Sequence, residues 1–272
     1  MAGLEKTTEA LGDKCLGILG AGHMGRAVAR GLAGAGFPLS RLRVCHRGSS
    51  ATLSAIQADG LEQCLVRPDQ LGLECGIIVA AIRPQDRGSI AALSPGSLFI
   101  SFMAGTPLAS LPLRPGIERV RVMPSAPSTI ALRRGIAAVF PQDHVIAGEI
   151  CRALGLTTIP VSSEDSLHAF TALGPCLPVA LAVLRSRGKD ADDTELEHLG
   201  ARNGLSDYGR ILSWARSVVP SFHTDDERES FIASAATRGG VTEAIITAIR
   251  NGRDLPDALE AGIRRSRELH GD

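Results

Sequence analysis

The chain has 272 residues, of which 44% are hydrophobic and only 3% aromatic, and its formal net charge at pH 7 is zero. That length is enough for two modest domains or one large one, and a neutral chain gives no reason to expect nucleic acid or an anionic membrane as a partner. The longest apolar stretches are strand-sized or interrupted by charge, so we expect no membrane-spanning helix.

Six cysteines are scattered along the chain without a C-x-x-C pair, and several lie inside apolar runs. This usage indicates buried thiols in a reducing compartment, with no disulfide framework and no metal site. Residues 1–14 carry three acidic side chains and no apolar signal segment, so we expect a short disordered lead and a cytoplasmic location.

The most informative segment is 15–25, where an apolar run leads into Gly20, Gly22 and Gly25 and a helical pattern follows. This is G-x-G-x-x-G between a strand and a helix, which is typical of a dinucleotide-binding turn. Gly20 allows the tight turn, Gly22 lets the backbone approach a pyrophosphate, and Gly25 lets the helix pack on the strand. The helix N-terminus offers N–H groups to the phosphates. His23 and Met24 lie inside the turn and are further candidate cofactor contacts, and a purely structural turn is the alternative.

Residues 15–160 alternate between apolar strands and helices. Strands are predicted at 15–19, 41–45, 77–81, 98–102, 119–122, 136–140 and 157–161. Helices are predicted between them at 24–35, 51–58, 86–93 and 142–153. Because the strands are nearly continuous apolar runs, they predict a parallel sheet covered on both faces, in a doubly wound α/β domain of the Rossmann type.

Strand patterns stop after about residue 161, and the remaining chain predicts helices at 164–186, 194–218, 225–236, 242–251 and 255–269. We therefore expect an NADP-binding Rossmann domain over 1–161 and an all-helical substrate and dimerisation domain over 162–272. The helical part has many apolar faces for its size, so we expect it to pair with a second copy of the chain in a homodimer.

The segment after the second predicted strand indicates which dinucleotide binds. An NAD site usually has Asp or Glu there to hold the ribose 2′-OH, whereas this chain has His46, Arg47, Ser49 and Ser50. Arg47 can grip a 2′-phosphate and the two serines can donate hydrogen bonds to it. The pattern favours NADPH over NADH. The alternative is a solvated arginine and a serine cap for the next helix, and both interpretations can hold together.

Four blocks follow one another in order at 18–25, 80–85, 121–127 and 237–242. Their sequences are ILGAGHMG, AAIRPQ, RVMPSAP and TRGGVT. Together they resemble the pyrroline-5-carboxylate reductase family, in which the last three blocks contain A-V-K-P-Q, R-x-M-P-N-T-P and S/T-P-G-G-x-T. The resemblance spans almost the whole chain.

The resemblance implies a reductase that passes hydride from NADPH to the carbon of a cyclic imine, as in proline biosynthesis. It also implies an interlocked dimer, sometimes assembled further, with the active site between one subunit's cofactor domain and helices that include the partner's. Thr242 matches the hydroxyl that hydrogen-bonds the imine nitrogen and Thr237 the other hydroxyl of that loop, so both are candidate catalytic residues. The implied cofactor contacts are Ala81, Arg83, Pro84, Met123 and Ser125. The implied substrate contacts are Cys176, Arg238, Gly239 and Gly240.

The stretch that receives the substrate carboxylate in the family, T-x-L-S-G-S-G-P-A, differs here. Residues 171–179 read TALGPCLPV, so both serines are gone, Leu177 replaces a glycine and Pro175 removes a backbone donor. Arg238 replaces the family's proline and is a cation that could meet a carboxylate. We therefore expect an imine reductase with an altered substrate, a larger or differently functionalised imine in a specialised biosynthetic pathway.

Two other functions stay open. A β-hydroxyacid-type dehydrogenase has a similar glycine turn but needs a lysine on a core helix, and lysine occurs here only at Lys6, Lys14 and Lys189. A dinucleotide-binding sensor without catalysis would explain the rewritten 171–179 stretch. His168, on a predicted helix, is a further candidate proton donor, although a packed or surface histidine is the simpler interpretation.

Overall fold

The computed structural model describes residues 11–90 and 97–271. Contacts between Cα atoms divide the chain into two compact units, Met1–Thr158 and Ile159–Asp272. Most of the predicted disordered lead, residues 1–10, lies outside the described part of the chain, as do residues 91–93 of the helix predicted at 86–93.

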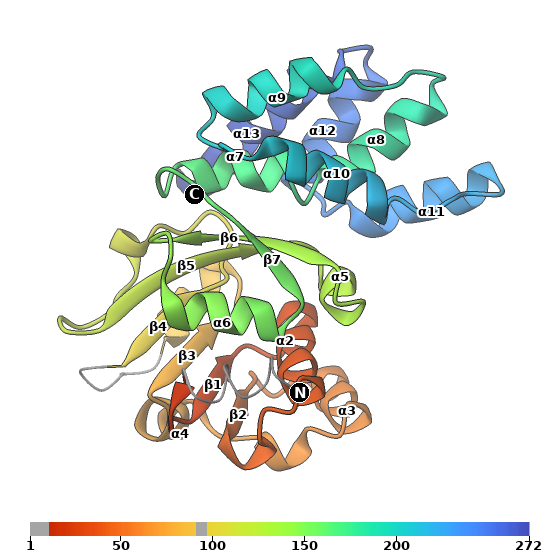
Figure 1. Cartoon of the computed structure of the whole chain (residues 1–272). Helices are drawn as coiled ribbons and strands as arrows, with labels where there is room; N and C mark the ends of the chain where they lie inside the picture. The colour runs from red at the N-terminus through yellow and green to blue at the C-terminus, as the bar shows by residue number, and fades with distance from the viewer. Residues whose placement is uncertain (1–10, 91–96, 272) are drawn as a thin grey trace. The chain divides into compact units, whose positions relative to one another are not determined.

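The first unit is built on a seven-stranded sheet with the order β2-β1-β3-β4-β5-β6-β7 (Figure 1). Its strands are β1 (Leu16–Leu19), β2 (Leu42–Cys45), β3 (Ile77–Ala80), β4 (Leu98–Ser101), β5 (Glu118–Pro124), β6 (Gly135–Phe140) and β7 (Leu156–Ile159). β1 pairs in parallel with β2 and β3, and parallel pairing continues through β4 to β5. β6 departs from the predicted parallel arrangement and runs antiparallel to β5. The short connection at 125–134 explains this, because a parallel crossover needs a dozen or more residues.

Helices cover both faces of this sheet. They are α2 (His23–Gly34), α3 (Ser50–Ala58), α4 (Pro68–Glu74), α5 (Pro127–Ala131) and α6 (Val145–Ala153). Leu16 and Ile18 of β1 pack in one apolar cluster with residues of α2 and α6, whereas Leu19 packs with Leu71 of α4 in a second cluster. Side chains alternate between the faces of a strand, so β1, β3 and β4 each contribute to both clusters. The doubly wound α/β prediction is confirmed.

Two helices of this unit, α4 and α5, were absent from the sequence prediction. They have seven and five residues, too few to show a helical period, but both begin at a proline in the first turn. Proline is favoured there because its missing N–H would have no partner in the helix. The helix predicted at 86–93 is, in its described part, the 3₁₀ helix Pro84–Ser89.

Beyond the end of β7, the second unit is helical in its described residues (Figure 1). Its helices are α7 (Ser166–Leu173), α8 (Leu177–Ser186), α9 (Asp193–Arg202), α10 (Tyr208–Val218), α11 (Asp225–Ala235), α12 (Val241–Arg250) and α13 (Leu255–Gly271). α8 packs against α10, α11 and α12, and α13 packs against α7 and α12. The prediction of a helical second half is therefore confirmed.

Two long helices predicted in this unit are each divided in two. The 164–186 helix breaks between Leu173 and Leu177, where Pro175 cannot donate a backbone hydrogen bond. The 194–218 helix breaks at Gly204, whose φ of +79° is a left-handed conformation that glycine adopts without steric cost. The first break has a consequence for the candidate site, because it places Cys176 at the N-cap of α8.

Among the described residues, the stretch Ser166–Ser186 is long and apolar enough on length and composition to cross a membrane. However, 89% of that window is buried inside the structure. α7 and α8, which make up this stretch, pack against α10 to α13. A core helix pair of this kind passes the same compositional test, so the stretch is weak evidence for a membrane span.

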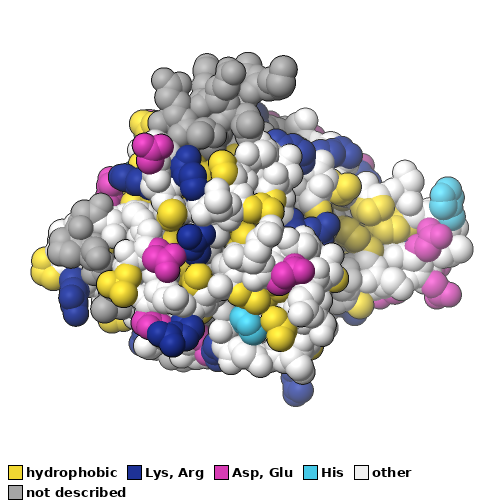
Figure 2. All heavy atoms as spheres, turned by 90° about the horizontal axis from the view of Figure 1, so that it is seen from below, with side chains coloured by type: hydrophobic (Ala, Val, Ile, Leu, Met, Phe, Trp, Pro, Cys, Tyr) yellow, Lys and Arg dark blue, Asp and Glu magenta, His cyan; other side chains and the backbone are white. Residues whose placement is uncertain are grey.

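Basic and acidic side chains are mixed on the face shown in Figure 2, with apolar side chains between them. The full chain has 29 Lys and Arg against 29 Asp and Glu. Many of these charges pair locally, as in Arg26–Asp59 and Arg43–Glu74, both at 2.7 Å. A nucleic acid approaching that face would meet charges of both signs.

Candidate functional site

The turn after β1 contains three glycines, and two of them, Gly20 and Gly25, stand where a Cβ would clash. Gly20 has a φ of +98°, and a Cβ there would lie 2.6 Å from Ile82 Cγ2 and 2.8 Å from the carbonyl oxygen of Ala81. A Cβ at Gly25 would overlap the carbonyl oxygen of Gly20. A Cβ at Gly22 would meet no atom within 4 Å, so the backbone there borders open space. These environments fit the three roles that a dinucleotide turn demands.

The helix α2 begins directly in this turn, with Gly22 at its N-cap and His23 as its first residue. Gly22 offers no capping side chain, and the first turn of α2 contains no acidic residue. The N–H groups of that turn and the positive end of the helix dipole are therefore suited to a phosphate. His23 is exposed, and Met24 is partly buried against the apolar cluster.

The carboxyl ends of β1, β2 and β3 lie at one edge of the sheet, because these strands are parallel. The Gly20 N–H donates to the Cys45 carbonyl at 3.0 Å, and the Ala81 N–H donates to the Leu19 carbonyl at 2.8 Å. Gly20, Ala81 and His46, which follows Cys45, therefore occupy neighbouring chain segments at the edge where α/β folds bind ligands.

Two cations of the predicted cofactor set, Arg47 and Arg83, meet at one carboxylate. Nη1 of Arg47 donates to Asp86 Oδ1 at 2.6 Å, and Nε of Arg83 donates to Asp86 Oδ2 at 3.3 Å. Arg83 is the N-cap residue of the 3₁₀ helix that begins at Pro84 and carries Asp86. Both guanidinium groups belong to exposed residues, so this group of three side chains is open to a ligand from solvent.

The two predicted serines lie at the start of α3. Ser49 is its N-cap, and its Oγ accepts the N–H of Thr52 at a long 3.5 Å, whereas Ser50 is the first helical residue. His46 Nδ1 accepts the N–H of Gly48 at 3.1 Å. The structure thus contains the predicted serine cap. A cavity of about 350 Å³ lies beside this segment and is lined by His46, Leu65, Val66, Arg67, Pro68 and Gln70.

Met123 and Ser125, at the carboxyl end of β5, are both buried. The Ser125 hydroxyl lies 2.7 Å from Thr129 Oγ1 and accepts the N–H of Ile136 at 3.1 Å. These bonds tie the end of β5 to α5 and β6. The Ser125 hydroxyl therefore has a structural role, and a cofactor contact would have to share it.

In the second unit, Thr242 and Cys176 come together although they are 66 positions apart. Cys176 Sγ lies 3.3 Å from Thr242 Oγ1. Cys176 is buried at the N-cap of α8, and Thr242 is half-buried in the first turn of α12, whose N-cap is Gly240. Burial raises the pKa of the Cys176 thiol to about 11. The thiol is therefore protonated at neutral pH, and either group can donate the hydrogen bond.

The turn at 237–240 joins α11 to α12, and its residues Thr237, Arg238 and Gly239 are exposed. Gly239 has a φ of +72°. Its N–H donates to Glu243 Oε2 at 2.6 Å, and its carbonyl accepts Nε of Arg265 at 2.8 Å. The turn is thus held from both sides, which fixes the start of α12 and with it the Thr242 backbone.

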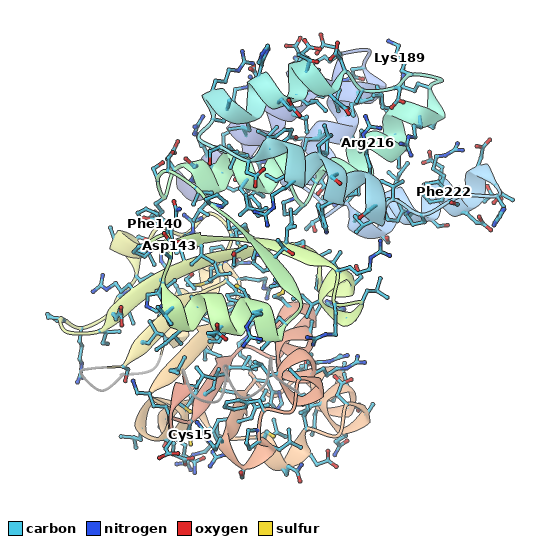
Figure 3. All side chains as sticks on the ribbon, in the orientation of Figure 1. Cys15, Phe140, Asp143, Lys189, Arg216 and Phe222 are labelled. Carbon is cyan, nitrogen blue, oxygen red and sulfur yellow. The ribbon has the colours of Figure 1, made fainter. Side chains whose placement is uncertain are left out.

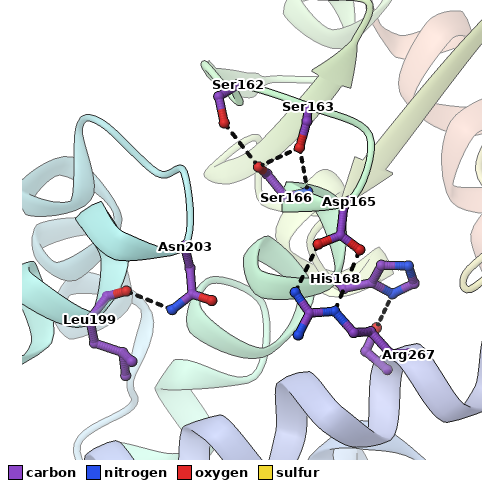
Figure 4. Close-up of polar contacts among 9 residues, drawn as sticks. Ser162, Ser163, Asp165, Ser166, His168, Leu199, Asn203 and Arg267 are labelled. Atoms are coloured by element: carbon purple, nitrogen blue, oxygen red, sulfur yellow. Dashed lines mark hydrogen bonds and ion pairs between the residues drawn. The ribbon is translucent and has the colours of Figure 1, made fainter.

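His168 is a packed residue (Figure 4). Its Nδ1 lies 3.0 Å from Ser266 Oγ, and nearby Asp165 pairs with Arg267 at 2.8 Å. Lys14 and Lys189 both lie outside helices, the latter in the connection after α8 (Figure 3), and Lys6 is outside the described residues. No core-helix lysine of the dehydrogenase kind is therefore found in the described ranges. Within them, no three metal-ligating side chains gather either.

Sequence reasoning missed Asp86, Glu243 and Arg265. Asp86 follows Arg83 by three residues in a helix that begins with proline, a spacing that brings the two side chains together. Glu243 is three residues after the N-cap Gly240, which is a known helix-start signal. No local pattern reveals Arg265 or the pairing of Cys176 with Thr242, because these contacts join residues that are distant in the sequence.

Comparison with known proteins gives relatives over nearly the whole chain. Residues 15–105 match the family described as NADP oxidoreductase coenzyme F420-dependent. The pyrroline-5-carboxylate reductase of Pseudomonas aeruginosa is 24% identical over 93% of this chain and 96% of that protein. The solved structure of a pyrroline-5-carboxylate reductase from Coxiella burnetii is 25% identical, covers 95% of this chain and 99% of that chain, and has a TM-score of 0.58. The Plasmodium falciparum pyrroline carboxylate reductase with NADP bound shares the fold, with a TM-score of 0.56 and 19% identity over 95% of this chain and 98% of that one.

The mostly parallel sheet, the glycine turn and the match at 15–105 define an NAD(P)-dependent oxidoreductase with a dinucleotide-binding first half. This confirms the prediction that the protein is an enzyme of that class. More particularly, the chain is similar to pyrroline-5-carboxylate reductases over nearly its whole length. The resemblance drawn from four short blocks is therefore confirmed over most of the chain's length.

Proposed function

We propose that the protein is an NADPH-dependent imine reductase that acts on a cyclic C=N bond. The observation that carries the proposal is the position of the Thr242 hydroxyl. It lies in the first turn of α12, within hydrogen-bond distance of the Cys176 thiol. The preceding turn, 237–240, is held in place by a hydrogen bond to Glu243. Relatives named pyrroline-5-carboxylate reductase over nearly the whole chain support it. The glycine turn of the first unit supports the cofactor half of the proposal.

In this proposal the first unit binds the dinucleotide and the second supplies the hydroxyl groups. Gly22 and the first turn of α2 receive the pyrophosphate, and Arg47 and Arg83 receive the adenosine end. When bound, the reduced cofactor supplies the hydride. The corresponding domain assignment is 1–161 for the cofactor and 162–272 for the substrate and for dimerisation.

Thr242 has the chemistry that imine reduction asks of a protein. The reacting carbon accepts hydride readily once its nitrogen is protonated or hydrogen-bonded, so catalysis consists mainly of positioning and charge stabilisation. The Thr242 hydroxyl donates a hydrogen bond to the imine nitrogen, and the nitrogen takes its proton from solvent water when hydride adds to the carbon. The Cys176 thiol fixes the direction of that hydroxyl. The Thr237 hydroxyl lies in the adjoining turn and is proposed to orient the substrate. Gly239 and Gly240, whose N–H groups already donate to Glu243 and to the Thr237 carbonyl, are proposed to border the substrate in the same turn.

The proposed preference for NADPH rests on charge. No acidic residue follows β2, where an NAD site would hold the ribose 2′-OH, and Arg47, Ser49 and Ser50 stand there instead. A cation and two hydroxyls suit a 2′-phosphate. The NADP bound in the Plasmodium falciparum protein belongs to a relative with the same fold.

The substrate is proposed to differ from pyrroline-5-carboxylate and to belong to a specialised biosynthetic route. Leu177 is fully buried and Pro175 offers no N–H, so the 171–179 stretch lacks both serines and one backbone donor of the family's carboxylate-binding stretch. The exposed Arg238 is the cation placed to compensate. We propose a cytoplasmic homodimer that pairs through the helical unit.

The test is loss of nicotinamide absorbance with NADPH and a panel of cyclic imines that includes pyrroline-5-carboxylate. We expect turnover on at least one imine and a loss of about 100-fold or more in kcat for Thr242→Ala, since a lost charge-stabilising donor costs that much. Thr247→Ala, an exposed position on the same helix, is the matched control and should leave turnover unchanged. Rapid turnover of pyrroline-5-carboxylate would overturn the altered substrate, and cofactor binding without turnover on any imine would favour a sensor.

A further inference from the structure

Asp86 joins two arginines that come from different parts of the sheet edge. Arg47 follows β2 and Arg83 follows β3, and their guanidinium groups reach separate oxygens of the same carboxylate at 2.6 Å and 3.3 Å. The side chains of Arg47 and Arg83 are 63% and 67% exposed, whereas that of Asp86 is 14% exposed. The carboxylate is therefore the largely buried member of the trio, and the two arginines are its exposed members.

Fixing these arginines has a physical consequence. A long exposed arginine loses rotamer freedom whenever it binds a ligand, and this entropy cost weakens the contact. An arginine already held by a carboxylate has lost much of that freedom beforehand. Each guanidinium has five N–H donors in a planar fork, so a bond to Asp86 leaves donors for phosphate oxygens. Two cations and one anion also leave the trio with a net positive charge.

The short helix that begins at Pro84 fixes the carboxylate itself. Arg83 caps this helix and Asp86 lies in its first turn, so the two side chains have a set spacing of three residues. Arg47 then reaches across from the segment after β2. Asp86 thus joins the two chain segments that were predicted to bind the cofactor, although it was not itself among the predicted residues.

We propose that Asp86 is a positioning residue for the adenosine end of the cofactor. It holds the Arg47 and Arg83 side chains together, so that both bind the 2′-phosphate and the protein selects NADP over NAD. The inference rests on the NADPH preference of the proposed function. It assigns that preference to a preorganised pair of arginines rather than to Arg47 alone.

The same carboxylate could instead weaken NADP binding. Asp86 would then repel the 2′-phosphate and occupy the arginine N–H donors that the phosphate needs. The two effects have opposite signs, so they are separable by substitution. If Asp86 positions the arginines, its removal weakens NADP binding. If it competes with the phosphate, its removal strengthens NADP binding.

The experiment is calorimetric titration of the full chain with NADP⁺ and with NAD⁺, which requires no turnover. Asp86→Asn keeps the size of the side chain and removes its charge, and we expect about a tenfold loss of NADP⁺ affinity with NAD⁺ affinity changed less than about twofold. Asp207→Asn is the matched control, because Asp207 also pairs with an exposed arginine three residues away, Arg210, at 3.0 Å. It should leave both affinities unchanged. Thermal unfolding of each variant checks that it is folded.

Arg47→Ala and Arg83→Ala should each lower NADP⁺ affinity. In either arginine variant, the further loss of NADP⁺ affinity caused by Asp86→Asn should be smaller than its loss in the wild type. An unchanged or raised ratio of NADP⁺ to NAD⁺ affinity in Asp86→Asn would overturn the inference while leaving the NADPH preference intact. A wild-type protein that binds both dinucleotides equally would overturn both. A shifted ratio in a protein that reduces no imine would uphold the role of Asp86 and contradict only the proposed catalysis.

Discussion

The two units hold their candidate residues in place by different physical means. In the first unit, the backbone itself makes the proposed cofactor turn, where a Cβ would clash at Gly20 and Gly25 and where Gly22 borders open space. In the second unit, the candidate substrate groups depend on side-chain contacts between distant residues, above all Cys176 with Thr242. A binding turn made by backbone atoms keeps its geometry when the side chains around it are substituted. A site made by side chains changes when one of those side chains is substituted. This difference fits the sequence, in which the glycine turn keeps the family's pattern while residues 171–179 depart from it.

The largest effect is expected where the backbone makes the site. Gly25→Ala would push a Cβ into the carbonyl oxygen of Gly20, so we predict a loss of more than about 3 kcal/mol of stability or a displaced turn. Dinucleotide binding should then fall below detection. Gly34→Ala, at the end of the same helix with no atom within 4 Å of the added Cβ, should change stability by less than about 1 kcal/mol. Equal behaviour of the two variants in urea unfolding and NADP⁺ titration would contradict this account of the turn.

In the second unit, Cys176→Ala removes the thiol beside Thr242. We predict about a tenfold fall in kcat with little change in KM, because the lost hydrogen bond orients a group that acts in the transition state. Cys176→Ser should recover much of the rate, since a hydroxyl can replace the thiol in that bond. Steady-state kinetics on an imine from the panel that the wild type reduces is the measurement. A Cys176→Ala enzyme with wild-type kcat would remove the thiol from the mechanism.

Alkaline stability tests burial in both units at once. All six cysteines are free thiols, and burial raises the pKa of Cys75 and Cys151 from 9.0 to about 12 and that of Cys176 to about 11. Above pH 9 the unfolded chain loses these protons while the folded chain keeps them. Stability is therefore complete below pH 9 and falls above it, by about 1.4 kcal/mol per pH unit for each such thiol.

Urea unfolding from pH 8 to pH 10.5 measures this slope. Cys151→Ala should reduce the slope of unfolding free energy against pH by the contribution of one buried thiol. This holds whatever effect the substitution has on stability at pH 8. A slope that is the same in the variant and the wild type would mean that Cys151 ionises as readily in the folded protein as in the unfolded one.

The smallest expected effect compares helix caps in the two units. Asp192 accepts the N–H groups of Thr194 and Glu195 at 2.9 Å and 3.2 Å at the start of α9, whereas Ser49 accepts that of Thr52 at 3.5 Å. Asp192→Ala should cost about 1 kcal/mol of stability and Ser49→Ala less than half of that. Thermal unfolding measures both. A larger loss of stability for Ser49→Ala than for Asp192→Ala would mean that the Ser49 hydrogen bond is stronger than its length of 3.5 Å indicates.

How far the sequence predicted the fold depends on how local each signal is. The seven strands were found because each is a short apolar run, and the glycine turn was found because its spacing is fixed by one strand and one helix. The antiparallel β6 was missed, since strand direction depends on the length of the connection and not on the strand. The breaks at Pro175 and Gly204 were readable as helix breakers but were outweighed by the apolar pattern around them. The contacts of Asp86 and Cys176 needed the folded chain, because they join segments that no local pattern connects.

The central claim is that hydride passes from a nicotinamide to an imine carbon. Incubating the protein with deuterium-labelled NADPH and the panel of cyclic imines, then measuring the mass of the amine formed, tests it directly. The account predicts an amine that carries one deuterium on the carbon next to nitrogen, formed by the wild type and greatly diminished in Thr242→Ala. A protein that binds NADPH but forms no labelled amine from any imine would contradict it.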